Sequence, residues 1–520
     1  MRNKLIFFLF ILFVIFIPIS LKFIGLVQND EWVYYPTIKN FLSFNFYLHP
    51  FVGTTFYSQA FLSLPFAYIF GLQYLPLLSL IVSILNIFIF IKLVQFIVPK
   101  GTFLFYVLVS LILFFNPIFF YSSFGFMTEV YTLLFILLSF YIYIYFLNNP
   151  SKNILFYLSL FFAVLAFFNR QTSVVLFPAF FIHLLFKKEY KKSIFVILIT
   201  FFLLIFYIFI FPKTPIMQKP YILQTNFYLF YKRFLGVLIY FGAFSLGVAP
   251  FILKKIFKFK KKELIIFFVL FTLSSFLLFK ITSLWIFPYF FNIFERFGFL
   301  YGELPGLKYS FRGFYTIFIW WERFSILFLS FLISLSFIHI LKLPISYKNI
   351  FTFFKNIYFL FFLLNFFSIL LLPKFYDRYF IYTFVFFLLF ILHSFKNYFK
   401  EPSLLTNTFL GLFVLFLGIY SLQNELDYLW WQKLTYSESF KLVNKGILPN
   451  QIYSTNAWRK KYNIPEENLK NPNLKYFFSF KMPKNSVPNN FKIYNIYTNK
   501  KALNLFLNPK IYLYEKAEKH

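Results

Sequence analysis

The chain has 520 residues, of which 60% are hydrophobic and 13% are charged, and the absence of cysteine excludes disulfides, thiolate metal sites and cysteine nucleophiles. Soluble domains carry roughly a quarter charged residues, and 94 Phe and 39 Tyr are too many for one water-soluble core, so a soluble globular fold is excluded. The formal net charge of +33 does not point to a nucleic acid partner, because the lysines cluster between apolar runs, as the positive-inside rule expects of a membrane protein.

The first apolar run extends from Leu5 to Ser20, after Arg2 and Lys4, and its hydrophobic character continues toward Val27. A cleaved signal peptide is the alternative interpretation, since the charge pattern fits one. No small-x-small cleavage site follows, however. We therefore expect a retained membrane helix with its N-terminus in the cytoplasm.

Further apolar runs of near-membrane length follow, and the sequence predicts about 13 spans in all. They are expected near residues 5–27, 74–95, 102–118, 127–147, 154–169, 171–186, 193–212, 233–253, 264–286, 324–341, 356–373, 378–395 and 407–425. The helices of the pair 154–186 are short and meet at Asn169, Arg170 and Gln171. No internal repeat is evident in the sequence, so the inverted-repeat signature of many transporters is not seen.

The charged residues between these spans orient the protein in the membrane. Four lysine clusters fall on the same side as the N-terminus: Lys187, Lys188, Lys191 and Lys192; Lys254, Lys255, Lys258, Lys260, Lys261 and Lys262; Lys342, Lys348 and Lys355; Lys396 and Lys400. Most acidic residues fall on the other side: Asp30, Glu31, Glu129, Glu295, Glu303, Glu322 and Asp377. An odd number of spans then places the C-terminal tail outside. We expect an integral protein of the bacterial plasma (inner) membrane, with a cytoplasmic N-terminus and an extracytoplasmic C-terminus.

The tail differs in character from the rest, with polar turns and no run of span length. A helix is predicted from Glu438 to Lys445. Strands are predicted at Gln451–Thr455, Tyr476–Lys481, Phe491–Thr498 and Lys510–Glu515. The predicted fold class is therefore an all-α polytopic membrane protein, comprising residues 1–425, with a small extracytoplasmic α/β C-terminal domain at residues 426–520.

The first outward loop contains Asp30 and Glu31 immediately after a membrane helix. A charged group at the end of a membrane helix costs free energy unless it is paired or hydrated, so the two carboxylates are candidates for function. The alternative is a solvated helix end, in which the two carboxylates only mark the membrane interface.

The whole loop, at about residues 28–73, resembles the first extracytoplasmic loop of GT-C class glycosyltransferases, in particular the relatives of protein O-mannosyltransferases and of the bacterial lipid A aminoarabinose transferase. In those families an Asp follows the first helix, a Tyr comes three or four residues later, and a Gly closes the segment after short amphipathic helices. Asp30, Tyr34 and Gly71 match these three positions. His49 precedes a Pro, where the relatives often carry Lys or His.

Three further stretches are similar to the same families. Glu129 stands where a second acidic residue faces the first across a cavity, although a Glu in the first turn of a helix is also favoured by the helix dipole. Lys374, Arg378 and Tyr379 precede the penultimate long helix, where relatives carry an Arg-Tyr pair and where an interfacial snorkelling pair is the alternative. Arg170 lies at the outer end of the short helical pair.

A stretch of the tail, from Gly446 to Ile452 and on to Trp458, is similar to the soluble C-terminal domains of many bacterial relatives. The resemblance covers residues 1–200 well, 370–460 moderately and the middle of the chain poorly.

The use of arginine is a separate observation, because this chain strongly prefers lysine. Every Arg except Arg2 is predicted outside: Arg170, Arg233, Arg296, Arg312, Arg323, Arg378 and Arg459. The planar guanidinium suits phosphate better than the point charge of lysine, so these residues are candidate phosphate contacts. Chance, together with the positive-inside use of lysine, is the alternative.

The resemblance implies glycosyl transfer from a polyprenyl-phosphate sugar to a lipid, glycan or protein acceptor, with inversion at the anomeric carbon. Asp30 is the candidate general base, and Glu129 or Glu31 the second carboxylate that positions the acceptor. The candidate substrate-binding residues are Tyr34, His49, Arg170, Arg378, Tyr379 and Lys374. Carboxylates and water also suit Mg²⁺ or Mn²⁺, but the sequence shows no dedicated metal cage, and many relatives need no metal.

Other functions fit parts of the same pattern. A lipid-linked-glycan flippase or secondary transporter would usually carry ionisable residues near the membrane midplane, whereas most acidic residues here lie at predicted helix ends. A glycan polymerase or ligase usually has one large late outward loop, for which Pro288–Arg323 is a candidate. A non-catalytic scaffold is the third alternative. No Gly-rich phosphate loop is present, which argues against a nucleotide-driven pump.

Overall fold

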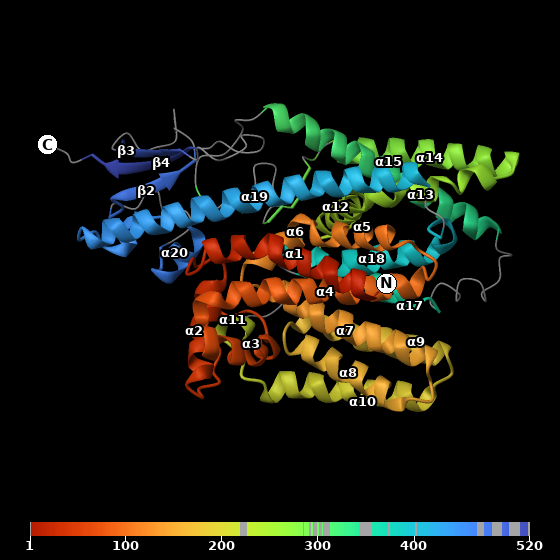
Figure 1. Cartoon of the computed structure of the whole chain (residues 1–520), viewed down its shortest axis with the longest axis horizontal. Coiled ribbons are helices and arrows are strands. Elements are labelled where there is room, and N and C mark those ends of the chain that lie inside the picture. The colour runs from red at the N-terminus through yellow and green to blue at the C-terminus, as the bar shows by residue number, and fades with distance from the viewer. Residues whose placement is uncertain are drawn as a thin grey trace.

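The computed structural model describes residues 2–218, 226–283, 285, 287–290, 293–294, 299–300, 304, 312–342, 355–372, 375–400, 403–464, 473–480, 491–498 and 510–517. Most of these residues are helical, and a small sheet lies near the C-terminus (Figure 1). The helices are α1 (Arg2–Lys22), α2 (Glu31–Leu42), α3 (Tyr57–Phe70), α4 (Leu75–Ile97), α5 (Phe103–Phe114), α6 (Pro117–Phe124), α7 (Thr128–Asn148), α8 (Asn153–Phe167), α9 (Leu176–Phe186), α10 (Tyr190–Ile205), α11 (Pro215–Gln218), α12 (Phe227–Ser245), α13 (Ala249–Leu253), α14 (Lys261–Thr282), α15 (Arg312–Lys342), α17 (Ile357–Leu370), α18 (Phe380–Ser394), α19 (Leu404–Asn444) and α20 (Asn456–Lys461).

Long apolar helices confirm a polytopic membrane protein. Among the described residues, 9 helical segments are long and apolar enough to cross a bilayer, or up to 10 if the bent pair α5–α6 is one span. The predicted number of about 13 is not confirmed, because three of the predicted runs form shorter helices: Asn153–Phe167, Gln171–Phe186 and Ile357–Leu370. A helix of about 15 residues rises only about 22 Å, less than the roughly 30 Å of a typical hydrocarbon core.

Local sequence sets where several of these helices begin. The side chains of Asn226, Asn356 and Ser403 accept hydrogen bonds from backbone N–H groups in the first turns of α12, α17 and α19. Asn116 caps α6 in the same way, and Pro117 follows it as the first helical residue. Proline lacks an N–H donor and so disfavours continuation of α5 through this point, where α5 and α6 meet at an angle of 73°.

Burial separates central helices from peripheral ones. The central helices α7 and α18 are buried over most of their length, whereas α10 and α14 expose most of their apolar side chains. In Figure 1, α10 lies at the lower edge of the molecule and α14 at its upper right edge. Exposed apolar faces of this size are stable only against lipid, so these two helices form part of the membrane-facing surface.

The segment between α1 and α4, where the first outward loop was predicted at residues 28–73, contains two short helices, α2 and α3. The last turn of α3 exposes Tyr68, Ile69 and Phe70, by 83%, 68% and 53%. Apolar side chains exposed to this degree at a helix end suit the interface between bilayer and water.

The C-terminal part begins as a continuation of α19, which runs for 41 residues without a break across the predicted boundary at residues 425 and 426. The sheet has the order β1-β2-β4-β3, with β1 (Ile452–Tyr453) parallel to β2 (Tyr476–Ser479). Strands β3 (Phe491–Thr498) and β4 (Lys510–Lys516) pair antiparallel, and the four strands lie where the sequence predicted them. Figure 1 shows the sheet at the far end of α19, away from the other long helices.

The helices that carry the predicted site run from one end of the molecule to the other. Glu129 lies in the first turn of α7 and Arg378 precedes α18, whereas two of the lysine clusters follow the opposite ends of α9 and α18. We call these two ends the arginine end, defined by Arg170 and Arg378, and the lysine end, defined by Lys187–Lys192, Lys254–Lys262 and Lys396–Lys400.

The orientation of these ends can be tested directly, because the chain has no cysteine that would give background labelling. We expect Lys260→Cys to be shielded from a membrane-impermeant maleimide in intact cells and Asn450→Cys to be labelled. The physical reason is the excess of lysine at the lysine end, because lysine-rich loops stay on the cytoplasmic side of a membrane. Labelling of both residues after membrane disruption is the control, and the reverse pattern in intact cells would overturn the orientation.

Candidate functional site

Four segments that are far apart in the sequence meet at the arginine end. Arg378 Nη1 lies 2.6 Å from Asp30 Oδ2, and Arg378 Nε lies 3.8 Å from Glu129 Oε1. Glu129 Oε1 also accepts a hydrogen bond from Arg170 Nη2 at 3.1 Å. We call Asp30, Glu129, Arg170 and Arg378 the acid–arginine network. Sequence reasoning proposed each of these residues, and the structure brings all four together.

Two tyrosines hold the arginine side chains in place. The Tyr379 ring centroid lies 4.9 Å from the Arg170 guanidinium carbon and 5.7 Å from that of Arg378. Arg170 Nη1 donates to the Tyr382 hydroxyl at 3.2 Å. Aromatic faces attract guanidinium groups and restrict their rotation. The sequence analysis missed Tyr382, although it follows Tyr379 by three residues and so shares its face of the helix.

Burial divides the network into an inner pair and an outer pair. The side chains of Arg170 and Glu129 are 5% and 3% exposed, whereas those of Arg378 and Asp30 are 17% and 20% exposed. Breaking a buried pair by removing one partner leaves an uncompensated charge, so Glu129 and Arg170 stabilise each other. The outer pair is the part of the network that a ligand can reach.

A cation from the C-terminal part also acts on Asp30. Burial alone would raise the pKa of Asp30, but the Arg378 guanidinium, followed by Lys460 and Arg170, holds this pKa below its ordinary value. Lys460 belongs to α20, which contacts α2. Sequence reasoning missed Lys460, and no local signal could have found it, because 430 residues separate it from Asp30.

Asn169 connects the first loop to α7 directly beside the network. Its side-chain amide donates to Thr132 Oγ1 at 2.7 Å and to the Thr128 carbonyl at 3.3 Å. Its side-chain oxygen accepts from the Gln59 N–H, and its carbonyl accepts from the Phe56 N–H. Because Arg170 is the next residue, these bonds fix the backbone that carries one of the two guanidinium groups.

Tyr34 lies beside the network, as predicted. Its ring is buried and stacks on Phe56, with centroids 4.6 Å apart and planes inclined by 11°. Burial raises the pKa of the hydroxyl, and the carboxylates of Asp30 and Glu129 raise it further, so Tyr34 stays protonated and is suited to donate a hydrogen bond.

One predicted site residue, His49, lies away from the network, and another, Lys374, is outside the described residues. The His49 ring packs against Trp32 and Phe51, and among the described residues no contact joins it to the network. Burial lowers the pKa of His49, so the ring is neutral at pH 7 and adds no positive charge. Lys374 lies outside the described residues, as do the side chains of Arg296 and Arg312.

Glu31 has a structural role, although it is adjacent to Asp30 in the sequence. Its two carboxylate oxygens accept from the backbone N–H groups of Gln28 at 2.7 Å and Phe126 at 2.6 Å. Burial raises the pKa of Glu31 to about 8, and the two amide donors act in the opposite direction. The side chain is fully buried and joins the start of α2 to the segment before α7, which is not the arrangement of an acceptor-binding carboxylate.

For two other arginines, Arg233 and Arg459, the structure does not support the hypothesis of a phosphate contact. Arg233 donates to the carbonyls of Leu370 and Leu372, and so satisfies backbone acceptors at the end of α17. Arg459 donates to the Tyr453 hydroxyl within the C-terminal part. Among the described residues, only Arg170 and Arg378 face carboxylates in the acid–arginine network.

The described residues offer no cluster of the kind that holds a metal ion by protein ligands alone. No group of three or more His, Cys, Asp or Glu residues converges anywhere in the part of the chain that the structure describes. Asp30 and Glu129 are each paired with arginine, and the two guanidinium groups repel a cation. The network is therefore suited to an anionic ligand group rather than to Mg²⁺ or Mn²⁺.

Comparison of the chain with known protein families, with curated proteins and with solved structures found no match in any of the three. The fold and the site by themselves define the class: a polytopic α-helical membrane protein with a buried acid–arginine network at one end of its helices.

The two adjacent carboxylates should respond differently to mutation. We expect Glu31→Ala to lower the free energy of unfolding by about 3 kcal/mol, because the buried backbone N–H groups of Gln28 and Phe126 both lose their hydrogen-bond acceptor. Thermal unfolding in detergent, followed by tryptophan fluorescence, measures this loss. Glu189→Ala, which removes a half-exposed carboxyl paired with Lys192, is the matched control and should change the same free energy by less than about 1 kcal/mol. An equal, small effect of both substitutions would contradict the structural role of Glu31.

Proposed function

We propose that this protein is a glycosyltransferase that moves a monosaccharide from a polyprenyl-phosphate donor to a hydroxyl group of a lipid, glycan or protein acceptor. The observation that carries the proposal is the pair of Asp30 and Arg378, a partly exposed carboxylate in contact with a guanidinium group, backed by a second buried pair. A displacement at a sugar phosphate needs a base for the acceptor and positive charge for the leaving phosphate.

The arginines are suited to bind the leaving phosphate group. A guanidinium binds phosphate through two parallel N–H···O bonds, which are stronger than bonds between neutral groups. Arg378 is the more exposed of the two arginines, and Arg170 lies behind Glu129. A donor phosphate would contact Arg378 first, with Tyr379 keeping both guanidinium planes oriented.

Phosphate binding would also change the basicity of Asp30. In the structure Arg378 holds the pKa of Asp30 low, which makes it a weak base. A phosphate that competes for Arg378 weakens this interaction and raises the Asp30 pKa, so the carboxylate becomes a better base when the donor is present. The site is then activated by its own substrate.

The reaction follows as a single displacement. The acceptor hydroxyl oxygen forms a bond to the anomeric carbon, its proton moves to Asp30, and the bond between that carbon and the phosphate oxygen breaks. The polyprenyl phosphate leaves with the bonding electron pair, stabilised by Arg378. Tyr34 is placed to donate to the sugar or to the phosphate, and inversion at the anomeric carbon is the expected stereochemistry.

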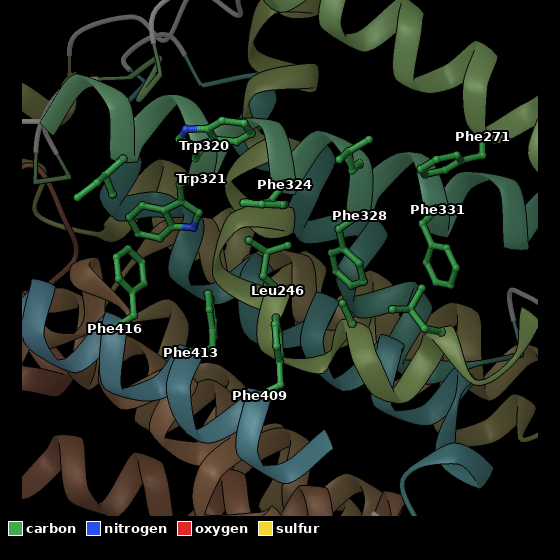
Figure 2. Close-up of a pocket in the computed structure, with 14 residues that line it drawn as sticks. Leu246, Phe271, Trp320, Trp321, Phe324, Phe328, Phe331, Phe409, Phe413 and Phe416 are labelled. Atoms are coloured by element: carbon green, nitrogen blue, oxygen red, sulfur yellow. The ribbon is translucent and has the colours of Figure 1, made fainter. Parts of the chain in front are cut away.

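An apolar groove between the membrane helices suits the polyprenyl chain. It has a volume of about 550 Å³ and lies between α14, α15 and α19, with the Leu246–Leu253 segment as a further wall. Figure 2 shows Phe409, Phe413 and Phe416 on one side of it, with Trp320 and Phe324 on the other. Every residue that lines it is apolar or aromatic, as an isoprenoid requires.

Two intervening residues, Phe294 and Asp377, link a groove residue to the start of the Arg378 segment. Trp321, which lines the groove, packs on Phe294 with ring centroids 5.5 Å apart. The backbone N–H of Phe294 donates to Asp377 at 2.6 Å, and Asp377 precedes Arg378 in the chain. Under this proposal, a lipid chain in the groove must pass along these packed residues before its phosphate reaches Arg378.

The transporter alternative fits the described residues less well than a glycosyltransferase does, and the described residues do not bear on the polymerase or ligase alternative. A transporter would carry its ionisable groups midway along the helices, whereas the network lies at helix ends, at Glu129 of α7 and Arg378 before α18. The polymerase or ligase alternative rested on the segment Pro288–Arg323. Most of this segment before Arg312 lies outside the described residues. We place the arginine end outside the bacterial plasma membrane, where polyprenyl-phosphate donors, glycan or protein acceptors and lipids meet.

The test of this function is sugar transfer from radiolabelled polyprenyl-phosphate monosaccharides, in membranes that contain equal amounts of each variant. We expect Asp30→Asn to lower the transfer rate at least 100-fold, because the base is lost while the side-chain shape is kept. Glu189→Gln is the control for a carboxylate at the lysine end and should transfer at the wild-type rate. Transfer that survives in Asp30→Asn would move the base to Glu129, and no transfer from any such donor would overturn the proposed function.

Lys460 provides a test of the contribution from the C-terminal part. We expect Lys460→Ala to raise the KM for the donor a few-fold with little change in kcat, since an exposed cation near Asp30 attracts the anionic donor without touching the reacting atoms. Lys461→Ala is the matched control, because Lys461 is the next residue but lies against Tyr462. Increasing salt should reduce the difference between wild type and Lys460→Ala, and a salt-independent loss of kcat would contradict this role.

A further inference from the structure

A second groove, of about 760 Å³, lies between α12, α15 and α18 and reaches the lysine end. Its walls are apolar along most of their length, with Leu238, Leu332 and Phe387 as examples from the three helices. We call it the lysine-end groove. It shares no lining residue with the groove of Figure 2 and does not include any member of the acid–arginine network.

The polar groups of the lysine-end groove are concentrated at one end. Lys255, Asn356 and His393 line this end, and Asn356 Nδ2 lies 3.1 Å from His393 Nδ1. The ammonium group of Lys255 lies 5.1 Å from the centroid of the Phe395 ring. A cation and an amide at the end of an apolar channel match a molecule that has an anionic head and a hydrocarbon tail.

The groove opens sideways, where a membrane lipid can enter. Ile333 and Phe337 are 46% and 47% exposed, whereas Leu329 and Leu335 on the same helix are 5% and 1% exposed. Exposed apolar side chains along one edge of a groove in a membrane protein face the acyl chains of the bilayer. The buried wall behind them is the surface against which one chain would lie.

The charges around the polar end favour an anionic head group over a zwitterionic one. Lys254 and Lys258 flank Lys255 on the segment that follows α13, and Lys396 lies in the turn after α18. Lys258 packs on the ring of Tyr398, which holds these two segments next to each other. These lysines add positive charge at the polar end of the groove.

We propose that the lysine-end groove is a binding site for an anionic phospholipid, with the phosphate at Lys255 and one acyl chain along α12, α15 and α18. This site is separate from the proposed glycosyltransferase centre and does not depend on it. Cationic residues between membrane helices at the cytoplasmic side are suited to acidic lipid head groups, and each lysine near such a surface contributes about fivefold in affinity.

The test measures lipid binding and not activity, so its result is independent of the proposed reaction. The full-length protein in a mild non-ionic detergent is titrated with palmitoyl-oleoyl-phosphatidylglycerol or with the zwitterionic phosphatidylcholine of the same chains, and bound lipid is counted by native mass spectrometry. We expect phosphatidylglycerol to bind more tightly than phosphatidylcholine. Lys255→Ala should weaken phosphatidylglycerol binding about fivefold and bring it close to that of phosphatidylcholine.

Three further variants make the assignment specific. Lys255→Arg keeps the charge and should restore binding, and Lys262→Ala, at an exposed lysine of the same cluster, should leave it unchanged. Ser336→Trp places a large side chain in the groove without altering its charge and should reduce binding of both lipids. Equal binding of the two lipids by wild type, unchanged binding by Lys255→Ala, or an equal loss in Lys262→Ala would each overturn the proposal.

Discussion

The pairing of two carboxylates with two arginines at one end of the helices is the interaction on which the arrangement of the chain depends. Asp30, Glu129, Arg170 and Arg378 come from four separate segments, and each charge would be costly at this depth without its partner. Because the ion pairs form only when these segments meet, they specify how α2, α7, α9 and α18 come together at this end. Apolar packing between the helices alone is less directional.

The same network connects structural and chemical roles. Its inner pair is almost fully buried and positions Arg170, and its outer pair remains accessible and offers a carboxylate next to a guanidinium. Asn169 ties the first loop to α7, and the carboxylate of Asp377 ties the segment around Phe294 to the turn before α18. Loops from different parts of the sequence are thus held rigidly around Asp30, and such rigidity is what a reaction with a developing phosphate charge requires.

The C-terminal part acts on the site although it lies outside the helical bundle. The continuous helix α19 extends from the apolar region into this part, so it carries the sheet and α20 in a defined direction. Trp458 of α20 packs on Phe440 and Tyr436 of α19, which fixes the short helix that bears Lys460. The contact of α20 with α2 then brings Lys460 near Asp30, so the C-terminal part lies against one side of the site.

The sequence by itself determined the membrane class, the positions of most helices and strands, and the candidate residues Asp30, Glu129, Arg170 and Arg378, because apolar runs, period-two strands and charges at helix ends are local patterns. It did not determine how many helices cross the bilayer, since α8 and α17 have the right composition but a length that only the structure measures. Nor could it separate Asp30 from Glu31. Their difference depends on which distant group lies opposite each carboxyl, Arg378 for Asp30 and the amide of Phe126 for Glu31, and only long-range packing decides those partners.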